Sequence, residues 1–205
     1  MIIAGESPSG GTYDLYDGQL LITSTETSGA VNTGGVIQFY GHDGGSSRGF
    51  GSIRCLKENG TSGNHNAYMA FLLRVNGGNP TERLRIDSSG RLLVNNTSST
   101  SPDGFNHLIQ VNSANHEGGI TIGRHTANSN GPALIFQKSR SGSATPGNGV
   151  VSNGDLLGAI RFYGSDGTDR NSHAANIGCE VDGTPGGNDM PGALIFSSTA
   201  DGSAS

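Results

Sequence analysis

The sequence predicts an all-β fold in which short, glycine-rich strands form two tandem repeat units, and three observations support this prediction. Glycine contributes 35 of the 205 residues, and with Ser, Asn and Thr, which are also poor helix formers, it makes up nearly half of the chain. Short apolar runs recur between Gly, Asn, Asp and Ser, which is the pattern of strands separated by turns. A segment from the first half of the chain also recurs in the second half.

The apolar runs are expected to be the strands. In chain order they are 13–16, 19–23, 36–40, 52–56, 68–75, 83–86, 91–94, 107–111, 120–122, 133–136, 159–163, 176–181 and 193–196. Several alternate with a period of two, so that Ile160 and Phe162 face one side and Arg161 the other. The run 68–75 is the longest, and it is predicted to be a buried strand, with a short helix as the alternative. Asx-Gly dipeptides between the runs favour tight turns, because both residues tolerate positive φ.

The internal repeat is carried by residues 35–44 (GVIQFYGHDG), which parallel residues 158–167 (GAIRFYGSDG). The further correspondences are 53–55 with 177–179, 69–72 with 193–196, and the strand 19–23 with 133–136. The chain is therefore expected to hold two related units.

The repeat also sets the expected domain boundaries. Residues 1–34 are assigned to an N-terminal segment with the first strands of unit 1, residues 35–100 to the remainder of unit 1, and residues 101–205 to unit 2. Unit 2 stops at Ser205, where a counterpart of residues 80–94 is expected to begin. We therefore expect unit 2 to be truncated at its C-terminal end.

Composition and charge exclude several classes of protein. A net charge of −5 with only 12 Lys and Arg leaves no broad basic surface, so nucleic acid is not expected as a partner. No apolar run approaches the ~20 residues of a membrane helix, so membrane insertion is not expected. Glycine is not spaced at every third residue, which excludes collagen. The first residues also lack the basic and apolar parts of a secretory signal.

Three pairs of carboxylates have the residue type that glycan cleavage needs for its acid and base. They are Asp14 with Asp17, Asp166 with Asp169, and Asp182 with Asp189. Each pair lies in or beside a turn rich in Gly and Asn, where an Asp caps backbone N–H groups, and we favour that structural role. Nucleophile and phosphate-binding motifs are missing from the sequence. No catalytic residue is therefore assigned, and the chain is not expected to be an enzyme.

The histidines and cysteines give no clear site. His116, Glu117 and His125 flank one predicted strand, so a cross-strand metal site is the alternative to loop histidines that bond to water. We favour water, and assign no metal and no other cofactor. Cys55 and Cys179 occupy equivalent places in the two units and are expected to be free, half-buried thiols. A bridge between equivalent positions would require the units to stack face to face.

Tyr40 and Tyr163 are the candidate surface-contact residues. Each follows a phenylalanine, Phe39 or Phe162, at matching strand ends, and alternation predicts that the Phe faces inward and the Tyr outward. An outward Tyr among Asn, Ser and Asp can stack on a sugar ring or pack against a neighbouring chain. We favour the neighbouring chain, because a unit with so few apolar residues needs partners to bury enough surface.

Three stretches resemble repeats of bacteriophage tail fibre and tailspike proteins, especially those of marine cyanophages. They are 80–94 (PTERLRIDSSGRLLV), 114–125 (ANHEGGITIGRH) and 131–142 (GPALIFQKSRSG), and the second unit is similar through 176–181 and 188–196. The resemblance implies an elongated, largely β, intertwined homotrimer in the virion tail, with identical chains and other virion tail proteins as partners. Many family members end in a self-cleaving chaperone domain, which no part of this sequence resembles.

The expected function is structural and adhesive: part of a phage tail fibre that attaches to a bacterial surface glycan. Binding would come from repeated shallow contacts of polar loops and outward tyrosines, whose avidity multiplies weak sites. One alternative is a tailspike that depolymerises polysaccharide. Another is a capsid decoration protein that uses the same repeats as a spacer.

Overall fold

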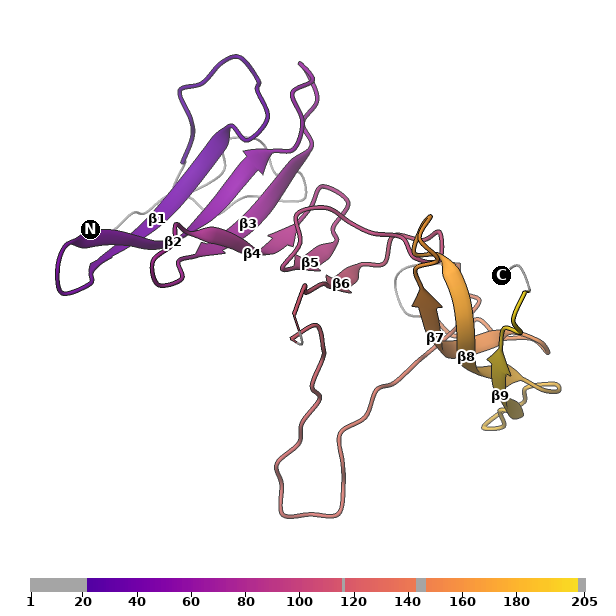
Figure 1. Cartoon of the computed structure of the whole chain (residues 1–205). Coiled ribbons are helices and arrows are strands. Elements are labelled where there is room, and N and C mark those ends of the chain that lie inside the picture. The colour runs from indigo at the N-terminus through magenta and orange to yellow at the C-terminus, as the bar shows by residue number, and fades with distance from the viewer. Residues whose placement is uncertain (1–21, 116, 143–146, 203–205) are drawn as a thin grey trace. The chain divides into compact units, whose positions relative to one another are not determined.

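The computed structural model describes residues 22–115, 117–142 and 147–202. These residues form nine strands and no helix, which confirms the predicted all-β class. Consequently the described part of the chain offers no helix of the length and hydropathy needed to cross a membrane. The strands fall into two sheets, one in each of two compact units (Figure 1).

Unit 1 consists of the chain up to residue 100 together with 107–119, and its strands form one sheet in the order β1-β2-β3-β4-β5-β6 (Figure 1). Neighbouring strands are antiparallel except β5 and β6, which are parallel. The strands are β1 (Gly34–His42), β2 (Ser47–Lys57), β3 (Ala67–Leu73), β4 (Thr81–Ile86), β5 (Leu92–Val94) and β6 (Ile109–Val111). The sheet therefore takes in β6, although this strand follows residue 100.

Unit 2 consists of 101–106 and the chain from residue 120 onward, and it holds a three-stranded antiparallel sheet in the order β7-β8-β9. The strands are β7 (Leu156–Gly164), β8 (Ser172–Val181) and β9 (Gly192–Ser198). Within the described residues of this unit, only Val151 and Val181 are buried apolar side chains. A single three-stranded layer has no second layer of its own chain to pack against, which explains this small core.

The nine observed strands all coincide with predicted ones, and the run 68–75 is strand β3 rather than the alternative helix. Two predictions are wrong. Runs 120–122 and 133–136 form no strand, because no described strand of the same chain pairs with their backbone. The predicted strand 13–16 and most of 19–23 lie outside the described residues.

From Gly35 and Gly158 onward, the hairpin β1-β2 and the hairpin β7-β8 are paired in the same way, although β7 has a further register shift between Leu156 and Gly158. The corresponding pairs, first unit before second, are Gly35–Cys55 with Gly158–Cys179, and Ile37–Ile53 with Ile160–Ile177. Both pairings then shift by one residue at the Phe-Tyr step of the first strand. The shift leaves one extra residue, Phe50 in β2 and Ala174 in β8, at a β-bulge.

The third strands correspond with a difference of one residue from the sequence comparison. Phe71 lies opposite Ile53, and Phe196 lies opposite Ile177, so Phe71 and Phe196 are equivalent. The sequence comparison had instead matched Leu72 with Phe196. A shift of one residue moves a side chain to the other face of its strand, so the hydrogen-bonded register must decide the equivalence.

Unit 1 buries a small cluster on one face of its sheet. The cluster consists of Tyr68, Ala70 and Leu72, which alternate along β3, together with Leu56 of β2. The intervening positions of β3 are also apolar and include the exposed Met69. Both faces of β3 are therefore suited to burial, but the described chain covers only one of them.

Polar contacts fix the edge of this cluster. The Tyr68 hydroxyl donates to Asn32 Oδ1 at 2.8 Å, and the Arg85 guanidinium lies 3.7 Å from the centroid of the Tyr68 ring. Glu82 accepts two hydrogen bonds from Arg85, at 2.6 and 2.9 Å. These contacts tie β3 to β4 and to the segment before β1, because one tyrosine donates a hydrogen bond through its hydroxyl and holds a cation over its ring.

Candidate functional site

The loop between β1 and β2 is organised by one carboxylate. Asp43 Oδ1 accepts the backbone N–H groups of Gly45 and Ser46 at 2.8 and 2.7 Å, and Oδ2 accepts Arg48 Nε at 2.9 Å. The N–H of Ser46, the Arg48 side chain and the N–H of Gly45 together lower the pKa of Asp43. Gly44 has φ +96°, which only glycine adopts freely, so the loop depends on the Asx-Gly pair.

The loop between β7 and β8 has the same construction. Asp166 Oδ1 accepts the backbone N–H groups of Thr168 and Asp169 at 2.8 and 3.1 Å, and Oδ2 accepts the Ser172 hydroxyl at 3.1 Å. The N–H groups of Asp169 and Thr168, followed by Ser172, lower the pKa of Asp166. Gly167 has φ +94°. The geometry supports the structural role favoured for Asp166, since a carboxyl whose pKa is lowered is a poor general acid.

For the other predicted carboxylate pairs, the structure gives no geometry that points to a catalytic site. Asp182 donates its backbone N–H to Pro191 O at 3.1 Å, and Asp189 exchanges two backbone hydrogen bonds with Gly186 in a tight turn. The pair at 14 and 17 lies outside the described residues. The described residues also hold no group of three or more His, Cys, Asp or Glu side chains that could bind a metal ion, and His116 is not among them.

Arg74, directly after β3, anchors the bulge of the first sheet. Its backbone N–H donates to Phe50 O at 2.8 Å, its Nε to Gly49 O at 2.7 Å, and its Nη1 to Gly78 O at 2.6 Å. The Phe50 ring lies over Gly41, where any Cβ would overlap it. The bulge therefore brings an arginine and an aromatic ring to the same end of the sheet.

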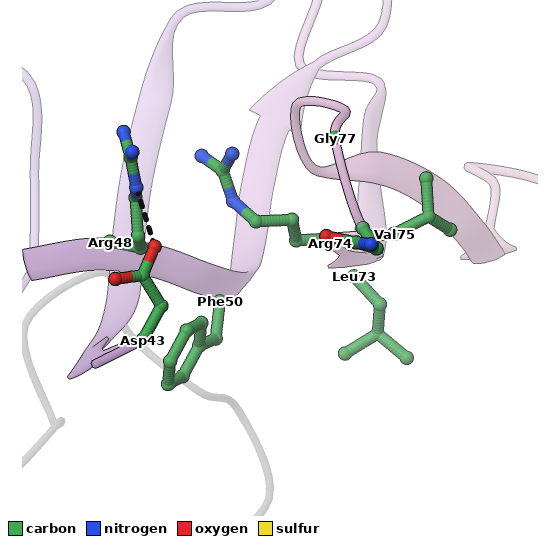
Figure 2. Close-up of a pocket in the computed structure, with 8 residues that line it drawn as sticks. Asp43, Arg48, Phe50, Leu73, Arg74, Val75 and Gly77 are labelled. Carbon is green, nitrogen blue, oxygen red and sulfur yellow. Dashed lines mark hydrogen bonds and ion pairs between the residues drawn. The ribbon is translucent and has the colours of Figure 1, made fainter. Parts of the chain in front are cut away.

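A shallow pocket of about 680 Å³ opens at this end of the first sheet (Figure 2). Its lining includes Asp43, Arg48, Phe50, Leu73, Arg74 and Val75. Figure 2 shows the ion pair of Asp43 and Arg48 on one side and the aliphatic Leu73 on the other. Guanidinium donors beside exposed apolar side chains suit a ligand with a polar edge and an apolar face, such as a sugar ring.

The second sheet has a pocket of about 870 Å³ at the corresponding end. Its lining includes Asp166, Asp169, Ser172, His173, Thr199 and Asp201. This lining is acidic and hydroxylated, whereas the lining of the first pocket is cationic and apolar. The two pockets occupy the same place in similar hairpins, but they present different chemistry to a ligand.

The two candidate tyrosines have different surroundings. Tyr40 is 67% exposed, and its Cζ lies 3.6 Å from the position that a Cβ on Gly49 would take, so one ring face covers this glycine. Tyr163 is half-buried and packs edge to face on His173, with ring centroids 5.3 Å apart. Tyr40 therefore offers the more accessible ring for stacking or for contact with another chain.

The predicted inward burial of the preceding phenylalanines is wrong within one chain. Phe39 is 51% exposed and Phe162 is 50% exposed, because no described layer of the chain covers their face of either sheet. Sequence reasoning also missed Phe50, Arg74 and Thr199 as pocket residues. The available sign was the charged Arg74 within an otherwise apolar run.

The cysteines are both free. Cys179 is half-buried as predicted, but Cys55 is exposed, so the expected half-burial is wrong for Cys55.

Comparisons with known proteins show likeness at the level of structure alone. No protein-family model and no curated protein matches the sequence. The C-terminal domain of the bacteriophage T5 L-shaped tail fibre has the same fold, with a TM-score of 0.70 at 15% identity over 97% of this chain and 84% of that chain. A second structure of that domain, with its intramolecular chaperone domain, gives a TM-score of 0.67 at 15% identity over 97% and 58%. The tail fibre likeness thus extends over both units.

Proposed function

We propose that this chain is a structural and adhesive component of a bacteriophage tail fibre, located in the tail of the virion. The observation that carries the proposal is the shared fold, which extends over 97% of this chain and 84% of the T5 fibre domain. The resemblance of residues 80–94, 114–125 and 131–142 to fibre repeats points the same way. Origin in a marine cyanophage belongs to the same proposal and rests on those stretches alone.

The proposed assembly is a homotrimer of identical chains. The described residues bury only seven apolar side chains, and such a small core favours partners that bury more surface. Interfaces of obligate oligomers are large and apolar, so association with sister chains would cover side chains that one chain leaves exposed. Exposed apolar residues occur on both units, for example Phe39, Leu73, Phe162 and Phe196.

Attachment to a bacterial surface glycan is the proposed role of the exposed loops. The pocket beside Arg74 and the open ring of Tyr40 supply donors and a stacking surface at one end of the first sheet. Each site is shallow, so useful affinity depends on several copies that bind one polymer together. Other tail proteins are the proposed partners within the virion.

The proposal gives the chain no catalytic role. Asp166 accepts three hydrogen bonds within its own loop, and Asp43 holds the same position in the first unit. A depolymerase would need a free acid and base at glycosidic spacing. Incubation with capsular or surface polysaccharide, followed by an assay for new reducing ends, is expected to give no product. If the chain produces reducing ends and the variant Asp166→Asn does not, the proposal that the chain has no catalytic role is overturned.

The test of location is electron microscopy of virions labelled with gold-conjugated antibody raised against this chain. The expected label lies on the tail. Label on the capsid would instead support a decoration or spacer protein and would reject the tail fibre assignment. Light scattering of the purified chain is expected to give three times the 20.9 kDa chain mass.

A further inference from the structure

The segment between β6 and β7 is the least covered part of the described chain. Each described residue from 117 to 142 is exposed, and none belongs to a strand (Figure 1). Within the described residues, no backbone group from 120 to 139 pairs with another backbone group. Apart from the Asn130 N–H, which donates to Asn128 Oδ1 at 3.2 Å, these exposed donors and acceptors can pair with a partner strand.

The sequence of this segment is that of buried strands. Ile120 and Ile122 alternate with polar or small residues, which suits a strand with one covered face. Leu134, Ile135 and Phe136 are consecutive, which suits a strand covered on both faces. Yet Leu134 is 64% exposed and Ile135 is 80% exposed. The segment has the composition of a buried strand, but the described residues of its own chain do not bury it.

The C-terminal end of the segment is held in place by contacts with other residues of unit 2. The Arg140 guanidinium donates two hydrogen bonds to the Asp155 carboxylate, at 2.7 and 2.6 Å, and the Arg140 N–H donates to Gly149 O at 3.0 Å. Phe136 lies directly on β7, because a Cβ added to Gly158 would stand only 2.5 Å from the Cβ of Phe136. The contacts of Arg140 and Phe136 therefore fix the position at which Leu134 and Ile135 leave the sheet.

A similar contact lies before β1 in unit 1. Ile22 lies on Gly35 of β1 so closely that a Cβ on Gly35 would overlap its carbonyl oxygen. Gly35 and Gly158 hold the same register position in their hairpins. In both units, then, the chain crosses the first strand at a glycine before it enters the sheet.

The charge of the segment fits a partner with the same sequence. Residues 126–137 contain no charged side chain. Identical segments packed around a symmetry axis bring equivalent residues together, and a charged residue would meet its own copies there. This stretch can be enclosed by sister chains without burying like charges. Arg124, the one Arg, Lys, Asp or Glu within 120–136, is exposed, and its long side chain can keep the guanidinium in water.

We propose that residues 120–136 form an exchanged arm, which pairs with and packs against the same arm of neighbouring copies of this chain. The inference rests on the proposed assembly of identical chains and assigns its interlocking element. Exchange gives hydrogen-bond partners to the arm backbone, covers Ile120, Leu134 and Ile135, and removes an exposed edge that would otherwise promote aggregation.

The test places the photoreactive residue p-benzoylphenylalanine at position 135 of the full chain, with a matched chain that carries it at position 184, in the exposed loop before β9. After irradiation, the arm probe is expected to give covalent chain-to-chain products on a denaturing gel, at least about fivefold more than the loop probe. Peptide mapping is expected to place the joined partner within 117–142 of the second chain.

A second measurement uses Ile135→Asp, with Thr184→Asp as the control that adds the same charge to the exposed loop before β9. Light scattering is expected to show loss of the trimer for Ile135→Asp and its retention for Thr184→Asp, with circular dichroism reporting whether strands remain. A trimer whose arm probe joins only to its own chain, or to nothing, would overturn the arm but leave the fibre assignment intact. A monomeric wild-type chain would overturn the arm and the proposed homotrimer, and the location of antibody label would still decide the tail assignment.

Discussion

Arg74 and Thr199 perform the same task in the two sheets. Each follows the third strand and donates its backbone N–H to the bulged residue, Arg74 to Phe50 O at 2.8 Å and Thr199 to Ala174 O at 2.9 Å. Each also donates from its side chain to the preceding carbonyl, at 2.7 Å from Arg74 and 2.8 Å from Thr199. Two unlike side chains thus satisfy the backbone that a bulge leaves open.

The first prediction concerns this anchor. Arg74→Ala removes both side-chain hydrogen bonds and is expected to lower the free energy of unfolding by about 1–3 kcal/mol, because Gly49 O and Gly78 O lose a charged donor. Thr199→Val removes one neutral hydrogen bond and is expected to cost about 0.5–1.5 kcal/mol. Urea denaturation followed by circular dichroism measures both changes.

The control for this prediction is Arg48→Ala, which removes an arginine from the same pocket but from an exposed ion pair. Exposed pairs contribute little, so this variant is expected to unfold close to wild type. Equal losses for the variants at 48 and 74 would show that the bulge anchor has no special role.

The second prediction concerns acid stability. In the folded chain, hydrogen bonds lower the pKa of three carboxyl groups. The largest contribution comes from the Ser46 N–H for Asp43, from the Arg140 side chain for Asp155 and from the Asp169 N–H for Asp166. Because the folded pKa lies below the unfolded value of about 4, this stabilisation is present above that pH and is lost as pH falls through the folded pKa. The midpoint temperature of thermal unfolding is therefore expected to decrease as the pH is lowered from about 4 to about 2.

Asp155→Asn is expected to reduce this pH dependence, since the variant has no carboxylate to protonate beside Arg140. Scanning calorimetry of both chains across the acid range makes the comparison. A midpoint that stays constant or rises on acidification would contradict the structural role of these carboxylates.

The third prediction concerns close approach of the backbone. Gly158→Ala places a Cβ 2.5 Å from the Cβ of Phe136, so the arm must move away from β7. The expected destabilisation is about 1–3 kcal/mol, as for other substitutions that overfill a contact. Gly164→Ala on the same strand meets nothing within 4 Å and is expected to change the free energy of unfolding by less than about 0.5 kcal/mol. Similar denaturation midpoints for the two variants would mean that Phe136 does not rest on β7.

The fourth prediction concerns attachment. Tyr40→Ala is expected to weaken binding to an array of bacterial surface glycans by about tenfold or more, because several linked sites lose a stacking surface at once. Tyr40→Phe keeps the ring and is expected to bind as wild type does. Tyr163→Ala is the matched control at the same register position, where the ring already packs on His173. Unchanged glycan binding by Tyr40→Ala would remove this residue from the proposed adhesive surface.

Local features of the fold could be predicted from the sequence. The loops at Asp43 and Asp166 involve residues within a few positions of each carboxylate, so residue type alone indicates the turn. The strand at 68–75 was predictable for the same reason, because its apolar side chains and flanking turns are contiguous. In contrast, Arg74 as an anchor required knowing that its strand end lies beside Gly49, 25 residues earlier in the chain.

Predictions failed where the described chain offers no neighbouring strand or covering layer. The runs 120–122 and 133–136 have strand composition but no strand beside them in the described chain. Phe39 has an inward pattern but no layer to cover it. Periodicity reports which residues can be buried, and only packing decides whether they are.

By itself the sequence determined the all-β class, the positions of the nine observed strands, the Asx-Gly turns after β1 and β7 and the capping role of Asp166, because these depend on residues adjacent along the chain. The tertiary structure decided which residues pair across strands: the one-residue offset of Phe196, the bulge at Phe50 and its anchor, and the parallel pairing of β6 with β5. The physical reason is that strand pairing is a contact between distant segments, and a shift of one residue costs little in local propensity but turns every side chain to the opposite face.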